Sequence, residues 1–296
     1  MSVSSRLTEV FQSAPEIQFD DTSRLIFFSD CHRGDNSWAD NFSKNQSVYF
    51  SALEHYFNEG FTYFELGDGD ELYENKYFSD IRYAQSHIFW VLREFYRAGR
   101  LFMLYGNHDK ERADPKVVER TLFSYIDDRT GQKKALFGGI QLFEGLVLKH
   151  SPSEGKILLV HGYQGDVWND ELWKITRWLA RFIWRPLQLI GVDDPASPAK
   201  NFRKRDALEA EIIEWIKENH QPAIFGHTHR PSFALAGEAQ YFNDGSCVHP
   251  RCITGIEIDR GDIQLIKWSI SADEKGYLLV SKDVLAGPRK VASLFV

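Results

Sequence analysis

Aspartate, asparagine and histidine side chains gather directly after five short apolar runs of this chain. Each run is ended by polar residues or glycine, as in Ser29-Asp30-Cys31-His32 and Gly226-His227-Thr228-His229. In chain order, the chemically capable residues at these points are Asp30, His32, Asp68, Asn107, His108, His161, His227 and His229. Imidazole nitrogens with carboxylate and amide oxygens are a ligand set that suits divalent transition metals.

The number of these ligands predicts two metal ions that share one carboxylate. An Asp-x-His or His-x-His pair on an extended segment points both side chains to the same side. Two ions about 3.5–4 Å apart can hold a hydroxide between them and clamp a phosphoryl group for in-line attack. Taken singly, the motifs have plainer explanations, because Gly-Asn-His-Asp also favours a turn and Asp68 could cap a helix. Those explanations do not account for five motifs that each follow an apolar run.

The apolar runs predict the strands that position these residues. The runs at 25–28, 61–66, 101–105, 156–160 and 222–225 are short and buried in character. Helical spacing covers about 45–58 and 80–98, and strand-like runs dominate after residue 230. Because the carboxyl ends of strands in an α/β sheet line a common crevice, the five motifs are expected to meet there. We predict an α/β protein with two sheets flanked by helices.

The chain length suits one large domain that carries an insertion. It has 296 residues and a mass of 34.3 kDa. We predict a main domain over 1–270, a helical insertion over 163–220 within it, and a C-terminal extension over 271–296. Proline-containing breaks interrupt the insertion at Pro186 and at 193–198.

Charge and cysteine content exclude several classes of protein. The net charge of −7 argues against a general nucleic-acid-coating role, so no stable nucleic-acid partner is expected. Three cysteines imply no disulfide framework and favour a reducing compartment. We see no signal-peptide pattern and no apolar run long enough to span a membrane. The expected location is the cytoplasm, with peripheral membrane contact as the alternative.

Taken together, the five motifs resemble those of the calcineurin-like metallophosphoesterase family, in order and over residues 25–230. The resemblance implies a four-layer α/β/β/α sandwich with a dinuclear centre, with Mn²⁺ as the first choice of metal and Fe or Zn²⁺ as the others. It implies that His108 faces the scissile phosphate and that Asp109 orients His108. It assigns Asp30, His32, Asp68 and His229 to one metal, and Asp68, Asn107, His161 and His227 to the second.

The predicted insertion gives the main clue to the substrate. Four of the eight tryptophans lie between 168 and 184, interleaved with lysine and arginine. A basic, tryptophan-rich helix can lie in a membrane interface or cover a site for an amphipathic substrate. Plain packing on the domain is the alternative. Trp173, Arg177 and Asn107 are candidate substrate contacts. Arg33 is another, because it could bind phosphate bidentately, with a salt bridge to a nearby carboxylate as the alternative.

An insertion directly after His161-Gly162 is similar to the lid of the UDP-2,3-diacylglucosamine pyrophosphatases, as is the string 226–231. In those enzymes a helical lid takes acyl chains, but they carry arginine where this chain has His108. We therefore expect a relative with a similar lid.

The predicted activity is hydrolysis of a phosphodiester or pyrophosphate by a metal-bridging hydroxide, on a small substrate that is lipid-linked or nucleotide-linked. One alternative is a phosphomonoesterase of the serine/threonine protein phosphatase kind. The other is a non-catalytic scaffold on the same fold, like the retromer scaffold subunit.

Overall fold

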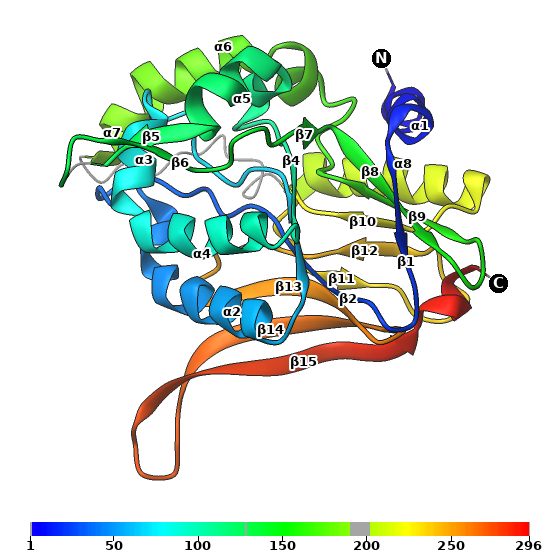
Figure 1. Cartoon of the computed structure of the whole chain (residues 1–296). Helices are drawn as coiled ribbons and strands as arrows, with labels where there is room; N and C mark the ends of the chain where they lie inside the picture. Colours follow the sequence, from blue (N-terminus) through cyan, green and yellow to red (C-terminus); the bar gives the residue numbers. More distant parts are fainter. Residues whose placement is uncertain (1, 128, 190–201, 296) are drawn as a thin grey trace.

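The computed structural model describes residues 2–127, 129–189 and 202–295, which form two large β-sheets packed face to face between helices (Figure 1). The predicted break at 193–198 lies outside these residues. The layer order is helices, sheet, sheet, helices, so the predicted four-layer α/β/β/α architecture is confirmed.

The seven-stranded sheet holds the first three motif-bearing strands side by side. β2, β3, β4 and β7 are parallel to one another, and β13, β14 and β15 continue the sheet in antiparallel fashion. In spatial order its strands are β15 (Leu278–Lys290), β14 (Asp262–Ala272), β13 (Cys252–Asp259), β2 (Arg24–Phe28), β3 (Thr62–Leu66), β4 (Leu101–Leu104) and β7 (Leu142–Phe143).

The six-stranded sheet holds the other two motif-bearing strands. β9 and β10 are parallel neighbours, so His161 and the segment after Phe225 leave the sheet at the same edge. In spatial order its strands are β1 (Glu16–Phe19), β8 (Gly145–His150), β9 (Lys156–Val160), β10 (Ala223–Phe225), β12 (Tyr241–Asn243) and β11 (Ser232–Phe233). A small separate ribbon pairs β5 (Ser124–Ile126) with β6 (Lys133–Ala135).

Alternation along the strands builds the layers. In β2, Leu25 and Phe27 face the second sheet, while Ile26 and Phe28 face the helices, as a period of two requires. The helical layer over this sheet consists mainly of α2 (Gln46–Asn58) and α4 (Ser86–Arg97). The opposite layer consists of α1 (Val3–Ser13) and α8 (Phe202–Asn219). The central strands of both sheets are therefore buried on both faces.

All five predicted motif-bearing strands are present, within one residue at either end. The predicted helix 80–98 is instead two helices, α3 (Phe78–Ala84) and α4, separated at Gln85. The buried Gln85 amide donates to the Gly34 carbonyl and to Asp40, so a tertiary contact replaces helix continuity there. The sequence pattern missed α1, α5 (Pro115–Leu122), β1 and β8.

The segment predicted as one insertion, 163–220, consists of two parts in different surroundings. The first part comprises a π-helical turn (Val167–Glu171), α6 (Trp173–Leu179), a second π-helical turn (Ala180–Trp184) and α7 (Arg185–Leu189). Neither α6 nor the second π-helical turn has a buried residue. The second part, α8, buries Ile212, Trp215 and Ile216 against the six-stranded sheet. The second part therefore belongs to the outer helical layer.

The last residues extend the seven-stranded sheet. The sequence predicts an extension over 271–296 with one short strand-like run. In the structure, β15 pairs with β14 over its whole length, and the two strands project from the body as a long hairpin (Figure 1). Among the described helices, none has both the length and the apolar character needed to cross a membrane.

We predict that two tryptophans of 163–220 differ sharply in their effect on stability. Trp215→Ala should lower the free energy of unfolding by about 3–5 kcal/mol, because it removes a buried ring from between α8 and α1. Trp178→Ala, at a ring that is 55% exposed, should change it by less than about 0.5 kcal/mol. Urea unfolding followed by circular dichroism measures both. Equal losses would contradict the division of this segment.

Candidate metal centre

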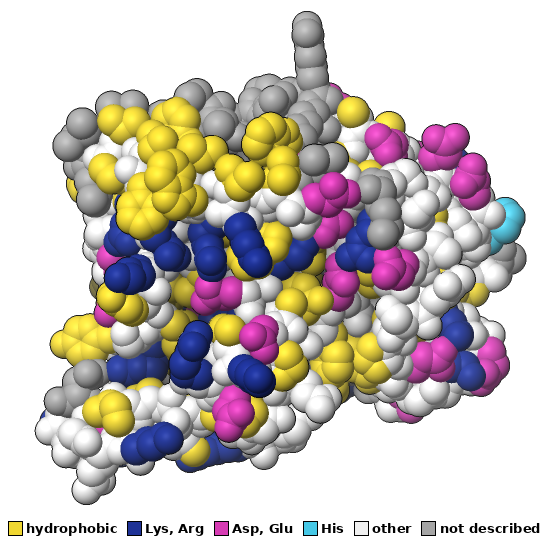
Figure 2. All heavy atoms as spheres, turned by 90° about the horizontal axis from the view of Figure 1, so that it is seen from above, with side chains coloured by type: hydrophobic (Ala, Val, Ile, Leu, Met, Phe, Trp, Pro, Cys, Tyr) yellow, Lys and Arg dark blue, Asp and Glu magenta, His cyan; other side chains and the backbone are white. Residues whose placement is uncertain are grey.

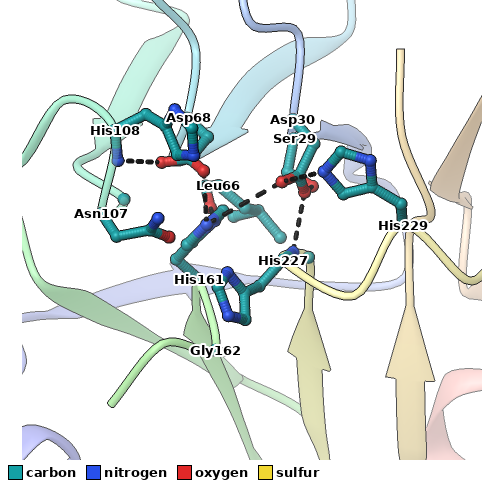
Figure 3. A network of polar contacts seen from close by, with 12 residues as sticks. Ser29, Asp30, Leu66, Asp68, Asn107, His108, His161, Gly162, His227 and His229 are labelled. Atoms are coloured by element: carbon teal, nitrogen blue, oxygen red, sulfur yellow. Dashed lines mark hydrogen bonds and ion pairs between the residues drawn. The ribbon is translucent and has the colours of Figure 1, made fainter. Parts of the chain in front are cut away.

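The ends of β2, β3, β4, β9 and β10 bring the predicted ligands to one place between the two sheets (Figure 3). Asp30, Asp68, Asn107, His161 and His227 are buried there. His32 and His229 lie at the more open side, with about one tenth and one fifth of their side chains exposed. The strand-end principle used on the sequence therefore holds for this chain.

Backbone hydrogen bonds hold the first two motif loops side by side. The Asp30 amide donates to the Gly67 carbonyl at 3.1 Å, and the His32 amide donates to the Asp68 carbonyl at 2.9 Å. Gly106 comes so close to the second loop that a Cβ there would lie 2.1 Å from Asp68 Oδ1. Because any side chain would collide at that point, the third loop can approach only with glycine.

The ligand residues have an uncommon backbone conformation. Asp30, His32, Asp68, His227 and His229 all have φ between 47° and 66°. Residues other than glycine seldom adopt this left-handed region, although aspartate and histidine do so more readily than most. The prediction that the Asp-x-His and His-x-His pairs lie on extended segments is therefore wrong. Their side chains converge because the chain turns sharply at each ligand.

The first ligand group consists of Asp30, His32 and His229. Asp30 Oδ1 lies 3.0 Å from His229 Nε2 and 3.6 Å from His32 Nε2. The two imidazole nitrogens face each other at 3.3 Å. His32 Nε2 also lies 3.8 Å from Asp68 Oδ2, so Asp68 borders this group as the predicted bridging ligand would.

The second ligand group consists of Asp68, His161 and His227. His161 Nε2 lies 3.2 Å from Asp68 Oδ2 and 3.9 Å from Asp30 Oδ1, so it connects the two groups. The other nitrogen, Nδ1, is 2.8 Å from the Leu66 carbonyl, which fixes the ring and leaves Nε2 as the free ligand atom (Figure 3). Asn107 lies beside this group, and its amide is 3.4 Å from Asn169 Oδ1.

The donor atoms fit divalent cations. Asp30 Oδ1, Asn107 Oδ1 and His161 Nε2 are buried and make no well-formed hydrogen bond to any described residue. A buried polar atom without a partner costs free energy, so such atoms in one place need a ligand that satisfies them together. Imidazole nitrogen with carboxylate and amide oxygen is a suitable set for Mn²⁺, Fe or Zn²⁺.

Electrostatics favour the anionic carboxylates that metal binding requires. Burial alone would raise the pKa of Asp30, but His229 and His161 hold it well below its usual range. Burial likewise opposes a charged His161, yet Asp68 and Asp30 raise its pKa to about 9. Burial, with the nearby His161, lowers the pKa of His227 to about 4. The carboxylates therefore attract positive charge to this place.

His108 is held by Glu71 and not by Asp109. His108 Nδ1 lies 2.8 Å from the Glu71 carboxylate, which also lies 2.8 Å from His32 Nδ1. Burial opposes a charged His108, but Glu71 and Asp68 raise its pKa. The ring of Tyr73 stacks on His108, with centroids 4.3 Å apart. The sequence signal for Glu71 was its place three residues after Asp68, whereas Tyr73 gave no signal.

The predicted role of Asp109 is therefore wrong. Its carboxylate accepts from the Gly106 amide at 2.6 Å and from the Gly69 amide at 3.2 Å. It also lies 3.5 Å from Arg112. Burial raises the pKa of Asp109 to about 6. Asp109 therefore connects the loop after β3, through Gly69, to the loop after β4, through Gly106.

The predicted phosphate contact of Arg33 is also wrong. The side chain is fully buried, and its guanidinium binds Glu65 with two nitrogens, at 2.6 and 2.9 Å. Its Nε donates to Asp70 at 2.7 Å, and Asp70 also binds Arg112. A substrate cannot reach a buried guanidinium that is already paired with two carboxylates. The salt-bridge alternative for Arg33 is the one that the structure shows.

Ser29 and Asp244 support Asp30 from behind. Ser29 Oγ lies 2.5 Å from Asp30 Oδ2 and 2.6 Å from Asp244 Oδ1. One hydroxyl hydrogen cannot serve both carboxylates. Burial and the negative charge of Asp30 raise the pKa of Asp244 well above its usual range, which favours a protonated Asp244 beside an ionised Asp30. Ser29 and Asp244 together therefore support Asp30 as an ionised metal ligand.

Trp173 and Arg177 lie about one turn apart on α6. The Arg177 guanidinium lies 4.9 Å from the centre of the Trp173 ring and forms an ion pair with Glu111. Glu111 lies in the short helical turn Lys110–Ala113, directly after the His108 motif. Contact between this pair and a substrate stays a prediction, as it does for Asn107.

The family of the chain follows from its sequence match. Residues 23–231 match the calcineurin-like phosphoesterase family. This range contains all five motifs and the whole ligand set. The chain belongs to this family, which agrees with its two-sheet fold and with the ligand groups that contain Asp30 and Asp68. No curated protein matches the chain.

Three solved structures cover most of the chain at low identity. Vacuolar protein sorting 29 from Cryptosporidium parvum is 12% identical, with a TM-score of 0.37, over 90% of this chain and 98% of that one. Chaetomium thermophilum Vps29 is 12% identical, with a TM-score of 0.38, over 88% and 96%. A protein assigned as a 5′-nucleotidase from Staphylococcus aureus, in complex with alpha-ketoglutarate, is 14% identical, with a TM-score of 0.36, over 88% and 53%.

We predict that divalent metal stabilises the folded chain through His161. After chelator treatment, adding Mn²⁺ at about 100 times its dissociation constant should raise the free energy of unfolding by about 2.7 kcal/mol. His161→Asn should lose most of this gain, because it removes a buried donor atom that connects both ligand groups.

Thermal unfolding with and without metal measures this gain. The matched control is His150→Asn, since His150 is buried but bonds to Ser153 and Asp21, outside the site. It should keep the full metal-dependent gain. A full gain in His161→Asn would contradict the ligand assignment.

Proposed function

We propose that the protein hydrolyses a phosphodiester or a pyrophosphate with the help of two divalent metal ions. The observation that carries this proposal is the pair of adjoining ligand groups at the strand ends, with His108 directly beside them. When bound, two such ions supply Lewis-acid activation of water and neutralise charge on a phosphoryl group. Mn²⁺ is the first choice, and Fe or Zn²⁺ are the others.

The residues of the chain divide the remaining tasks. Asp30, His32 and His229 would hold one ion, and His161 and His227 the other, with Asp68 between them. The amide of Asn107 would complete the second set. Backbone hydrogen bonds hold the ligand loops, and the rings of His32 and His161 each make a further hydrogen bond through Nδ1. The ligands should therefore move little when the metals bind.

His108 is placed to act as a general acid. Glu71 holds Nδ1, which leaves Nε2 for the leaving oxygen of a substrate. The nearby carboxylates of Glu71 and Asp68 overcome the effect of burial and favour the protonated ring. A protonated imidazole can donate a proton as the phosphorus–oxygen bond breaks.

A bulky substrate group is proposed for the side of the site next to the first part of the insertion. Asn169 contacts Asn107, and Lys110 donates to Asp170, so this segment lies against the site loops. The resemblance to UDP-2,3-diacylglucosamine pyrophosphatases supports a lipid-linked or nucleotide-linked substrate. Trp173 and Arg177 are the residues proposed to contact it. A cytoplasmic location is part of the same proposal.

Two other functions are compatible with the family. A phosphomonoesterase would use the same ligands on a substrate that does not need the insertion. A non-catalytic scaffold would keep the fold without turnover. We favour hydrolysis because both ligand groups and the Glu71–His108 pair are complete in this chain.

We predict metal-dependent hydrolysis of bis-p-nitrophenyl phosphate or a UDP-linked pyrophosphate in preference to p-nitrophenyl phosphate. His108→Ala should lower kcat by about 10²–10⁴ with both metals still bound, because it removes the proton donor. Glu71→Gln should lower kcat by about tenfold or more, since a neutral amide supports a protonated His108 less well. Each assay is run with Mn²⁺, Zn²⁺ and chelator, and metal content is measured in parallel.

His87→Ala is the matched control. His87 lies on α4 beside Phe50 and away from the ligand groups, so kcat should not change. Hydrolysis of the monoester alone would replace the proposal with a phosphomonoesterase. Metal-loaded wild type that hydrolyses none of the three probes would favour the scaffold.

A further inference from the structure

The helical segment 173–187 contacts the protein through its arginines and exposes several of its apolar side chains. Arg177, Arg181 and Arg185 follow one another at intervals of four residues and all reach the body of the protein. Arg181 donates to the carbonyls of Leu72, Tyr73 and Asn75, at 2.6, 3.2 and 3.1 Å. Arg185 donates to the Glu74 carbonyl at 2.7 Å and pairs with Asp35.

Four large apolar residues of the same segment are exposed. Ile175, Trp178 and Phe182 recur at helical spacing and are 51%, 55% and 61% exposed. The rings of Trp178 and Phe182 lie against each other, with centroids 5.7 Å apart. Surface helices normally do the reverse, because burial of the apolar face is what stabilises them. We call the exposed side chains of Ile175, Trp178, Phe182 and Ile183 the outer patch.

Figure 2 shows apolar side chains gathered on this upper face beside a row of lysine and arginine. The sequence over 173–189 contains four basic residues and no acidic residue, and three of the four, Arg177, Arg181 and Arg185, bind the body of the protein. Lys174 is exposed next to the outer patch. An apolar surface with tryptophan and a cationic border has the composition of an interfacial helix.

We propose that the outer patch docks on the surface of an anionic lipid bilayer. The apolar side chains would enter the boundary between headgroups and acyl chains, and the exposed Lys174 at their edge would face the lipid phosphates. A second copy of the chain is a poorer occupant, because a two-fold interface through this patch would bring the exposed Lys174 of both copies toward each other.

Docking would place the bilayer next to the site loops. The Arg181 carbonyl contacts hold the loop of Leu72 and Tyr73, and Tyr73 stacks on His108. The inference goes beyond the proposed hydrolysis and does not depend on it, since binding to lipid is measured without substrate.

The test is co-sedimentation of the full chain with vesicles. Wild type should sediment with vesicles of phosphatidylglycerol and phosphatidylcholine, and less with phosphatidylcholine alone. Trp178→Ser and Phe182→Ser should each weaken this partition by about threefold or more, and together by about tenfold or more, because each removes apolar area from the interface. Trp90→Ser is the matched control: its ring is 51% exposed on α4, and partition should stay at the wild-type value.

A second pair of variants tests the charge. Lys174→Glu should weaken binding to the anionic vesicles at low salt, and high salt should remove the difference. Lys217→Glu, at an exposed position of α8, should bind like wild type. Melting temperatures of all variants verify that they are folded.

Two outcomes would overturn the proposal. One is wild type that does not sediment with anionic vesicles, or folded Trp178→Ser/Phe182→Ser protein that sediments as wild type does. The other is a wild-type dimer in size-exclusion chromatography that the double variant converts to a monomer, without lipid binding in either. That result would assign the outer patch to self-association.

Discussion

The metal centre depends on a buried cluster of charges beneath it. Arg33 and Arg112 share Asp70, and each binds one further carboxylate, Glu65 or Asp109. These residues come from β3 and from the loops after β2, β3 and β4, so the cluster connects three of the five strand ends that carry the ligands. Removal of one partner from a buried pair costs about 3–5 kcal/mol, because a charge is left uncompensated. The loops are therefore fixed relative to one another before any metal binds.

This support explains how the ligand residues keep a backbone conformation that costs free energy. Five ligand residues have left-handed φ angles, and each such position costs about 1–3 kcal/mol. Three features hold the loops in this conformation: the backbone hydrogen bonds between them, the close approach at Gly106 and the charge cluster. In return, the sharp turns point carboxylates and imidazoles from separate strands at one point. Membership in the calcineurin-like phosphoesterase family and the proposed hydrolysis rest on this convergence.

The segment after β9 and Gly162 connects the site to the molecular surface. Its arginines hold the loop of Tyr73, which in turn contacts His108, while the apolar side chains of the outer patch are exposed. α8, which follows in the chain, is an ordinary part of the outer layer. The loop of Leu72 and Tyr73 therefore contacts both the helical segment that carries the outer patch and His108 of the site.

The sequence by itself determined the strands, their order of motifs and the metal-capable residues, because short apolar runs ended by Asp, His and Gly are local signals. It also gave the family, since the motifs are specific. Tertiary structure alone decided which groups support them. Glu71 and not Asp109 holds His108, and Arg33 is buried, because partners from other strands compete for each side chain. The arginines of segment 173–187 face inward for the same reason. The carbonyls that Arg181 binds belong to a loop about one hundred residues earlier, which no local pattern can reveal.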